Sequence, residues 1–289
     1  MVIDARYKSI FVMPAAGLTV VLLVLSLYQA FVSDHEQTAW LGAAIASLPF
    51  PALIGWLTVK PVARTTETLP VFLATAAAGV LVSIWEQFIE GTSGWWPTSA
   101  ALLAALIFAT YVFWFSRFGR IPSMDLAVGG RLPDFELADS DGNLFSSAEL
   151  AGSPAVLMFY RGNWCPLCMA QIREIADRYR DLDALGIKVV LVSPQPDEQS
   201  RKLAATFDVP FHFLVDKNNE LARSLGIAVA NGVPIGTPGG YAPDTVLPTL
   251  VVTNANGTIV FSDQTDNYRV RPEPDMFLAI LRRSGVVPK

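Results

Sequence analysis

Two cysteines lie three residues apart in the segment RGNWCPLC, and they are the only cysteines in the chain. At the start of a helix, this spacing lets Cys165 and Cys168 face each other across one turn. The thiolate of one can attack a peroxide or a disulfide, and the thiol of the other can then resolve the product at a high effective concentration. The pair therefore predicts redox chemistry with Cys165 and Cys168 as catalytic residues.

The flanking sequence predicts a strand before the pair and a helix after it. Ala155–Tyr160 is a continuous apolar run of strand length, and apolar residues recur at helical spacing from Pro166 to Leu185. Pro166 suits the first position of a helix, which makes Cys165 the N-cap and Cys168 the third helical residue. Unpaired N–H groups and the positive end of the helix dipole would lower the pKa of both thiols. The local sequence thus favours reactive thiolates.

The alternatives for the two cysteines are a structural disulfide, a zinc site and two inert core residues. A structural disulfide is disfavoured in a cytoplasmic domain. Structural zinc usually has four ligands, and only two histidines, His35 and His212, could join the cysteines. Inertness does not explain why the pair sits between a strand and a helix. We therefore expect redox chemistry with no metal, flavin or nucleotide cofactor.

Strand and helix patterns alternate through the rest of the C-terminal half. LPDFELADSDGN is typical of a short strand that runs into an Asp-Gly turn, and NANG between two apolar runs is a hairpin signal. The expected strands are Lys188–Ser193, Phe211–Asp216, Thr249–Thr253 and 258–264. The expected helices are Asp197–Phe207, Asn219–Leu225 and Glu273–Arg283. Ala228–Leu247 is expected to be a loop. This order predicts an α/β domain whose sheet has helices on both faces.

The N-terminal half has the composition of a membrane protein. The chain is 52% hydrophobic and 16% charged, with a mean hydropathy of +0.40, whereas soluble proteins have about 25% charged residues. Four apolar stretches approach the roughly 20 residues needed to cross a bilayer. These stretches are Ile10–Val32, Ala39–Val59, Leu69–Ile89 and Thr98–Ser116. We expect a bundle of four transmembrane helices in residues 1–120, the second interrupted by Pro49 and Pro51, then a linker at 121–131 and the α/β domain at 132–289.

The distribution of basic residues predicts the orientation of these helices. Residues 1–120 contain six bases, which precede the first stretch, separate the second from the third, or follow the fourth: Arg6, Lys8, Lys60, Arg64, Arg117 and Arg120. The positive-inside rule makes that side cytoplasmic. The sequence thus predicts a multi-pass protein of the cell (inner) membrane, with both termini and the redox domain in the cytoplasm. The helical half has no cysteine, so it cannot pass a dithiol relay through the membrane. We therefore expect it to be an anchor in the lipid bilayer or an oligomerisation domain. The sequence leaves open whether the protein is a homo-oligomer.

The C-terminal half resembles a known family. The segment GGRLPDFELADSDGNLFSSAELAGSPAVLMFYRGNWCPLC (129–168) looks like the opening of the peroxiredoxin (AhpC/TSA-type redoxin) branch of the thioredoxin superfamily. The resemblance continues through KVVLVSP, FLVD, LARSLGI and TLVVTNANGTIVF and covers roughly residues 127–283. It implies a thioredoxin fold with a central mixed sheet, and it does not extend to the helical half.

At the reactive turn, the sequence resembles both peroxiredoxins and thioredoxins. Typical peroxiredoxins have Thr-X-X-Cys here, with a peroxidatic cysteine that corresponds to Cys168, so that Cys165 replaces the threonine. Thioredoxins have Trp-Cys-X-X-Cys, in which the first cysteine attacks, and Trp164 with the pair fits that pattern equally well. Which cysteine attacks first therefore stays open.

Further site residues depend on the same comparison. Peroxiredoxins place an arginine just before the strand that starts here at Thr249, but this sequence has Leu247–Pro248–Thr249, which resembles the cis-proline turn of thioredoxins. Arg161 is the first candidate to replace that arginine, although it could equally be a surface residue. The supporting residues implied by the resemblance are Trp164, Arg161, Pro248 and Thr249, with Arg269 and Arg271 as more distant candidates.

These features predict a membrane-anchored, peroxiredoxin-like thiol oxidoreductase with an antioxidant role that reduces hydroperoxides or protein disulfides. The resemblance implies a cellular thiol reductant, such as a thioredoxin or glutathione system. The soluble half carries the whole net charge of −5, so we expect no nucleic-acid partner. Two alternatives stay open. One is a redox sensor or assembly module whose disulfide state controls docking to a membrane partner without turnover; the other is an enzyme outside the cytoplasm that matures disulfides.

Overall fold

The chain folds into two compact units in the computed structural model, which describes residues 2–33, 35–89, 94–207 and 209–286. The α/β unit consists of Met1–Ser9, Pro61–Arg64 and Phe118–Lys289, and the helical unit consists of Ile10–Lys60 and Thr65–Arg117. These units differ from the predicted division at residue 120, because two short segments of the helical half belong to the α/β unit.

Specific contacts tie the additional segments to the α/β unit. Strand β1 (Ile3–Asp4) pairs in parallel with β7 (Ala228–Ala230). In the predicted linker, the side chain of Gln264 accepts a hydrogen bond from the Ser123 N–H at 2.6 Å and donates one to the Ser123 carbonyl at 3.1 Å. Because both backbone groups of Ser123 are held, this part of 121–131 belongs to the fold and is not a free linker.

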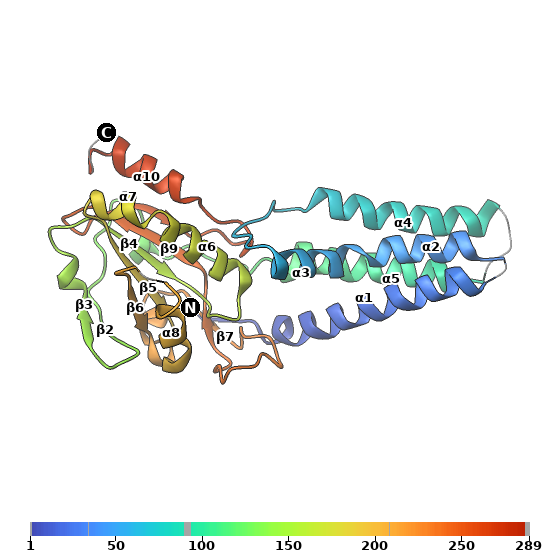
Figure 1. Ribbon diagram of the computed structural model, residues 1–289, viewed down its shortest axis with the longest axis horizontal. Helices are drawn as coiled ribbons and strands as arrows, with labels where there is room; N and C mark the ends of the chain where they lie inside the picture. The colour runs from blue at the N-terminus through green and yellow to red at the C-terminus, as the bar shows by residue number, and fades with distance from the viewer. Residues whose placement is uncertain (1, 34, 90–93, 208, 287–289) are drawn as a thin grey trace. The chain divides into compact units, whose positions relative to one another are not determined.

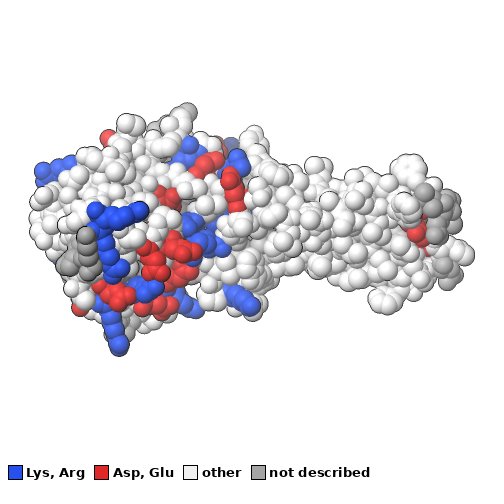
Figure 2. Space-filling view, turned by 90° about the horizontal axis from the view of Figure 1, so that it is seen from above, with Lys and Arg blue, Asp and Glu red and all other residues white. Residues whose placement is uncertain are grey.

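The helical unit forms helices at all four predicted apolar stretches (Figure 1). These helices are α1 (Arg6–Val32), α2 (Gln37–Ser47) with α3 (Pro49–Val59), α4 (Pro70–Ile89), and α5 (Trp96–Thr110), which continues as the π-helix η1 (Tyr111–Phe115). Among the described helices, three are long and apolar enough to cross a membrane, or four if α2 and α3, bent by 40°, are one span. The break falls at Pro49, which has no N–H to continue the ladder of helical hydrogen bonds. In the face shown in Figure 2, this unit has almost no charged side chains on its surface.

Helices α2 and α4 approach each other through small residues. A Cβ atom added to Gly79 would lie 2.3 Å from the Ala46 nitrogen and 2.5 Å from the Gly42 carbonyl oxygen. The hydroxyl of Ser83 also donates a hydrogen bond to the Ala39 carbonyl at 2.7 Å. Close backbone contact and a serine hydrogen bond between helices are typical of association inside membranes, where the hydrophobic effect does not drive helices together.

Gly79→Ala is expected to destabilise the helical unit by about 1–3 kcal/mol, because its Cβ would meet backbone atoms that cannot turn aside. The matched control is Gly55→Ala in α3, where an added Cβ meets nothing within 4 Å. Thermal unfolding of both variants in detergent measures the effect. Equal melting temperatures for the two variants would contradict the proposed α2–α4 contact.

The α/β unit contains a seven-stranded mixed sheet, as predicted. The strand order is β10–β9–β4–β5–β6–β2–β3, in which β4, β5 and β6 are parallel and all other neighbouring pairs are antiparallel. The strands are β2 (Glu136–Asp139), β3 (Leu144–Ser146), β4 (Ala155–Phe159), β5 (Lys188–Ser193), β6 (His212–Val215), β9 (Thr249–Thr253) and β10 (Ile259–Asp263). Every residue of β4 and β9 is buried, which explains why these central strands have continuous apolar sequences.

Helices flank this sheet close to the predicted positions (Figure 1). The predicted helix Pro166–Leu185 is divided at Arg178 into two helices. The helices are α6 (Pro166–Asp177), α7 (Tyr179–Ala184), α8 (Asp197–Ala204), α9 (Glu220–Ser224) and α10 (Pro274–Arg283), with 3-10 turns η2 (Met124–Leu126), η3 (Ser147–Leu150) and η4 (Lys217–Asn219). The five α-helices have 5 to 12 residues. The cysteine pair lies at the start of α6.

The predicted loop Ala228–Leu247 contains a second, smaller sheet. Its two ends form β7 and β8 (Thr245–Val246), which pair with each other, and β1 adds to β7 to give the order β1–β7–β8. The expectation of a plain loop is therefore wrong at both ends. The strands were missed because they are very short and because β1 comes from the opposite end of the chain.

Candidate active site

The structure places the two cysteines where the sequence predicted. Strand β4 ends at Phe159, α6 begins at Pro166, Cys165 is the N-cap with φ −94° and ψ 104°, and Cys168 lies in the first turn. Both are free thiols, and their Sγ atoms lie 2.8 Å apart. Cys165 is 2% exposed and Cys168 is fully buried. The sulfurs therefore face each other in a site that is closed to bulk solvent.

Arg271 is the cation that contacts the sulfurs. Its Nη2 lies 3.5 Å from the Cys168 Sγ and 3.9 Å from the Cys165 Sγ. Its Nη1 donates to the side-chain oxygen of Gln171 in α6 at 3.0 Å, and its Nε donates to the Tyr268 carbonyl at 2.9 Å. The side chain is 6% exposed, so its charge acts at short range in a medium that screens it weakly. The sequence had ranked Arg271 behind Arg161, and the contacts reverse that order.

Arg161 is buried and is not a surface residue. Its guanidinium donates to the Gly232 carbonyl at 2.7 Å and lies 4.4 Å from the ring centre of Trp164. Its backbone N–H donates a hydrogen bond to Cys168, and its charge also favours the thiolate. The structure therefore brings Arg161 and Trp164 next to the cysteine pair. Arg161 affects Cys168 through its backbone N–H and its charge, whereas the Arg271 side chain contacts both sulfurs directly.

The two thiols have opposite pKa shifts. Burial disfavours the Cys168 thiolate, but a hydrogen bond from Cys165, the charge of Arg271 and the Arg161 N–H together lower the pKa of Cys168 to about 5. Burial, the hydrogen bond with Cys168 and the charge of Cys168 raise the pKa of Cys165 well above its ordinary value. The expectation that both values are lowered is thus wrong for Cys165. At neutral pH, Cys168 is the thiolate and Cys165 is the thiol that donates to it.

The alkylation rate of Cys168 in the reduced protein is expected to follow its thiolate fraction. Because deprotonation creates the nucleophile, the rate should rise with pH, reach half of its maximum near pH 5 and be constant around neutrality. Iodoacetamide labelling, quenched at intervals and mapped by mass spectrometry, measures the rate at each cysteine. A midpoint at about pH 8.5, the ordinary value for cysteine, would contradict the assignment.

The structure does not place Pro248 and Thr249 in a cis-proline turn. No cis peptide bond occurs in the described residues, so the Leu247–Pro248 bond is trans and this expectation is wrong. The two isomers of an X–Pro bond differ by only about 0.5–1 kcal/mol, so the surrounding fold decides between them. Arg120 donates to the Pro248 carbonyl at 3.0 Å and to the Thr249 hydroxyl at 2.8 Å. Within the described residues, the polar side-chain contacts of Pro248 and Thr249 are thus with backbone groups and Arg120, not with the sulfurs.

Sequence reasoning missed a buried polar network beside the reactive turn. Gln195, which follows β5, donates to the Tyr160 hydroxyl at 3.0 Å and accepts from the Asn163 N–H at 2.8 Å. It also donates to the Ser200 hydroxyl at 3.1 Å. The only sequence signal was a glutamine placed directly after a buried strand, which is not specific. The network fixes the turn that precedes Cys165 from the side of the neighbouring parallel strand.

The segment between β7 and β8 covers the same turn. The Gly232 carbonyl of this segment accepts from Arg161, and the hydroxyl of Thr245, the first residue of β8, donates to the Arg161 carbonyl at 3.0 Å. The segment also provides Tyr241, which accepts a hydrogen bond from the backbone N–H of Trp164. These bonds hold the segment over the reactive turn, and they contribute to the burial of the cysteine pair.

The described residues contain no group of three or more His, Cys, Asp and Glu side chains arranged to hold a metal ion. His212 lies half-buried in β6 with its ring centre 4.5 Å from that of Phe145, and burial lowers its pKa. The chemistry that this site can perform with its own residues is therefore that of the dithiol and its two arginines.

Comparison with known proteins finds redox proteins that are similar to part of the chain. Residues 128–262 match the AhpC/TSA family. The chain is 27% identical to Peroxiredoxin Bcp of Bacillus subtilis over 104 residues, 36% of this chain and 66%, just under two thirds, of that protein. It is 26% identical to Thiol-disulfide oxidoreductase ResA of Geobacillus thermodenitrificans over 127 residues, 44% of this chain and 70% of that protein. Peroxidoxin BcpB from Mycobacterium tuberculosis aligns in three dimensions with a TM-score of 0.45 and 24% identity, over 55% of this chain and 97% of that chain.

The matched range contains the cysteine pair, the parallel strands β4 and β5 and helix α6, whereas Arg271 lies outside it. Both named relatives are redox proteins of the kind that the dithiol predicts. These matches support a thiol-dependent oxidoreductase, and the segment that is similar to the AhpC/TSA family, residues 128–262, contains most of the mixed sheet.

Proposed function

We propose that the protein is a membrane-anchored thiol peroxidase in which Cys168 attacks a hydroperoxide and Cys165 resolves the product. The observation that carries this proposal is the contact of Arg271 with the Cys168 sulfur at 3.5 Å, with the Cys165 sulfur 2.8 Å from the same atom. The ionised sulfur is thus the second of the pair, whereas a thioredoxin-type exchange would begin at the first.

The reaction balances on the residues of the site. The Cys168 thiolate attacks one peroxide oxygen, so that an S–O bond forms and the O–O bond breaks. The departing oxygen, next to Arg271, takes up a proton and leaves as an alcohol or water. The Cys165 sulfur then displaces the oxygen from the Cys168 sulfenic acid as water, which gives a disulfide. The two electrons come from the dithiol, and a cellular thiol reductant restores it by exchange.

Burial of the site favours a small substrate. Cys165 is 2% exposed and Cys168 is fully buried. A hydroperoxide group needs only a narrow opening to reach the Cys168 sulfur, whereas a protein disulfide needs both sulfurs of the pair to be accessible to another polypeptide. A hydroperoxide substrate therefore fits the reduced site better than a protein disulfide substrate.

The same proposal places four spans in the cell membrane and the α/β unit in the cytoplasm. It is supported by the apolar helices and by the chain connections. All three basic segments, at the start of α1, between α3 and α4, and after α5, contribute residues to one α/β unit. Arg64 and Arg120 bond to residues of that unit. Because these two arginines have partners inside the α/β unit, the positive-inside argument for a cytoplasmic side depends on the other four bases: Arg6, Lys8, Lys60 and Arg117.

Turnover of the full-length protein in detergent or nanodiscs tests the chemistry. Hydrogen peroxide, an organic hydroperoxide and insulin disulfide are supplied in parallel, each with a thioredoxin or glutathione reducing system. We expect turnover with the peroxides. Insulin reduction without peroxide turnover would make the protein a disulfide reductase, and background rates with all three would favour the redox sensor or assembly module.

Protease digestion tests the orientation. In intact cells we expect the α/β unit to be protected, and in inverted membrane vesicles we expect it to be cleaved. The reverse pattern would place the redox site outside the cytoplasm and would favour disulfide maturation.

A further inference from the structure

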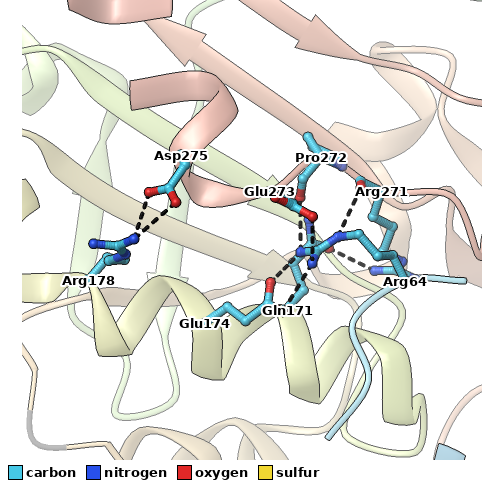
Figure 3. Close-up of polar contacts among 8 residues, drawn as sticks. All are labelled: Arg64, Gln171, Glu174, Arg178, Arg271, Pro272, Glu273 and Asp275. Carbon is cyan, nitrogen blue, oxygen red and sulfur yellow. Dashed lines mark hydrogen bonds and ion pairs between the residues drawn. The ribbon is translucent and has the colours of Figure 1, made fainter. Parts of the chain in front are cut away.

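Arg64 makes several contacts with the chain segment that carries Arg271. It lies in Pro61–Arg64, the short part of the α/β unit between α3 and α4. Its Nε donates to the backbone carbonyl of Arg271 at 3.2 Å, and its Nη2 donates to the carbonyl of Pro272 at 3.4 Å. Figure 3 shows this guanidinium between the 271–273 segment and helix α6.

Arg64 also binds helix α6. Its two terminal nitrogens pair with the two carboxylate oxygens of Glu174, and its Nη1 lies 3.6 Å from the carboxylate of Glu273. Glu174 follows Gln171 by three residues, so both lie on neighbouring turns of one helix face. Gln171 accepts the hydrogen bond from the Arg271 side chain. Arg64 therefore joins α6 to the backbone of the 271–273 segment, and Gln171 joins α6 to the side chain of Arg271.

We propose that Arg64 is a positioning residue for the redox pair. It holds the backbone of Arg271 against α6, so that the Arg271 guanidinium stays within reach of the sulfurs of Cys165 and Cys168. The helical half thus contributes a residue to the redox centre through the connection between α3 and α4, in addition to anchoring it. This inference rests on the role that the proposed function gives to Arg271.

Because the ion pair between Arg64 and Glu174 is partly exposed, its loss should affect the redox site more than the stability of the protein. The side chains of Arg64 and Glu174 are 25% and 33% exposed, and partly exposed ion pairs contribute little to global stability. Small displacements in an active site, by contrast, have large effects on its chemistry. Loss of Arg64 should therefore alter the sulfurs more than it alters the melting temperature.

The chain offers a matched control for the loss of an arginine on this surface. Arg178, also next to α6, pairs with Asp275 of α10 at 2.8 Å (Figure 3). It therefore joins the α6 region to the C-terminal segment as Arg64 does, but it donates to Asp181 and Asp275 and not to the backbone of Arg271. Arg178→Gln removes a comparable ion pair and leaves the support of Arg271 in place.

The test measures the pKa of Cys168 in the full-length protein by the pH dependence of its alkylation. Arg64→Gln is expected to raise this pKa by about one unit, because Arg271 is held less closely. Arg64→Lys keeps the charge but cannot bind a carboxylate and two carbonyls with one planar group, so it should restore the value only in part. Arg178→Gln should leave it unchanged.

The inference is overturned if Arg64→Gln leaves the pKa of Cys168 unchanged, if Arg178→Gln raises it equally, or if Arg64→Lys restores it fully, which would make charge alone sufficient. Should Arg64→Gln fail to fold, Glu174→Gln removes the carboxylate from the other side of the same contact and is expected to raise the pKa in the same direction. Because alkylation needs no substrate, the result is independent of turnover. A protein without peroxidase activity whose Cys168 still responds to Arg64 would sink the proposed function and leave this inference standing.

Discussion

Cys168→Ser is expected to reduce peroxide turnover to background, whereas Cys165→Ser is expected to retain one round of peroxide reduction. The serine hydroxyl at position 168 stays protonated beside Arg271, so the nucleophile is lost. A serine at position 165 can still donate a hydrogen bond to Cys168, so the thiolate persists and attacks, but no neighbouring thiol resolves the product. Rapid-mixing measurements of peroxide consumption should show a burst of about one equivalent in Cys165→Ser and none in Cys168→Ser.

Trapping identifies the intermediate in the same two variants. A reagent selective for sulfenic acids should label Cys168 in Cys165→Ser after exposure to peroxide, and mass spectrometry locates the label. The thioredoxin-type order predicts the opposite pattern: Cys168→Ser would accumulate mixed disulfides at Cys165, and Cys165→Ser would be inert. That pattern would overturn the assignment of Cys168 as the attacking sulfur.

Arg271→Met is expected to lower the rate of peroxide reduction at neutral pH by about 10²-fold. Removing one preorganised donor to a developing anion has effects of this size, and Arg271 is the side chain within hydrogen-bond distance of both sulfurs. The pKa of Cys168 should rise, because burial then acts against the thiolate with less compensation. Since the thiolate is the reactive form, part of the lost rate should return as the pH is raised.

Two controls accompany this variant. The loss of Arg271 leaves the buried Gln171 oxygen without this donor, which costs about 1–3 kcal/mol, so circular dichroism must show that the variant is folded. Arg201→Gln removes an exposed arginine that pairs with Asp141 and should leave both rate and pH profile unchanged. A folded Arg271→Met protein with the wild-type rate and profile would remove Arg271 from the mechanism.

Local patterns predicted the elements that are stabilised by their own sequence neighbours. The apolar run of β4 and the proline at the start of α6 placed Cys165 and Cys168 correctly, because strand burial and helix capping depend on residues a few positions away. The four apolar stretches of the N-terminal half appeared as helices for the same reason. The order of strands and helices predicted the α/β class, and the family resemblance implied that the sheet is mixed.

Contacts between distant segments were not predictable in this way. The pairing of β1 with β7 and the bonds from Arg64 to the 271–273 segment join parts of the chain that no local pattern connects. Arg64 and Arg120 were read only as charges that orient membrane helices, because their sequence surroundings give no sign of partners in the other half. The trans bond at Pro248 was likewise decided by the fold, since the chain itself has only a weak preference.

The sequence by itself determined that two thiols meet at the amino end of a helix, and hence that the protein has a redox pair. Only the tertiary structure decided which sulfur is ionised. A helix N-terminus favours both thiolates, but burial penalises each charge, and the balance is set by the nearest compensating group. That group is Arg271, which lies more than a hundred residues from either cysteine in sequence and is brought to 3.5 Å from Cys168 by the fold.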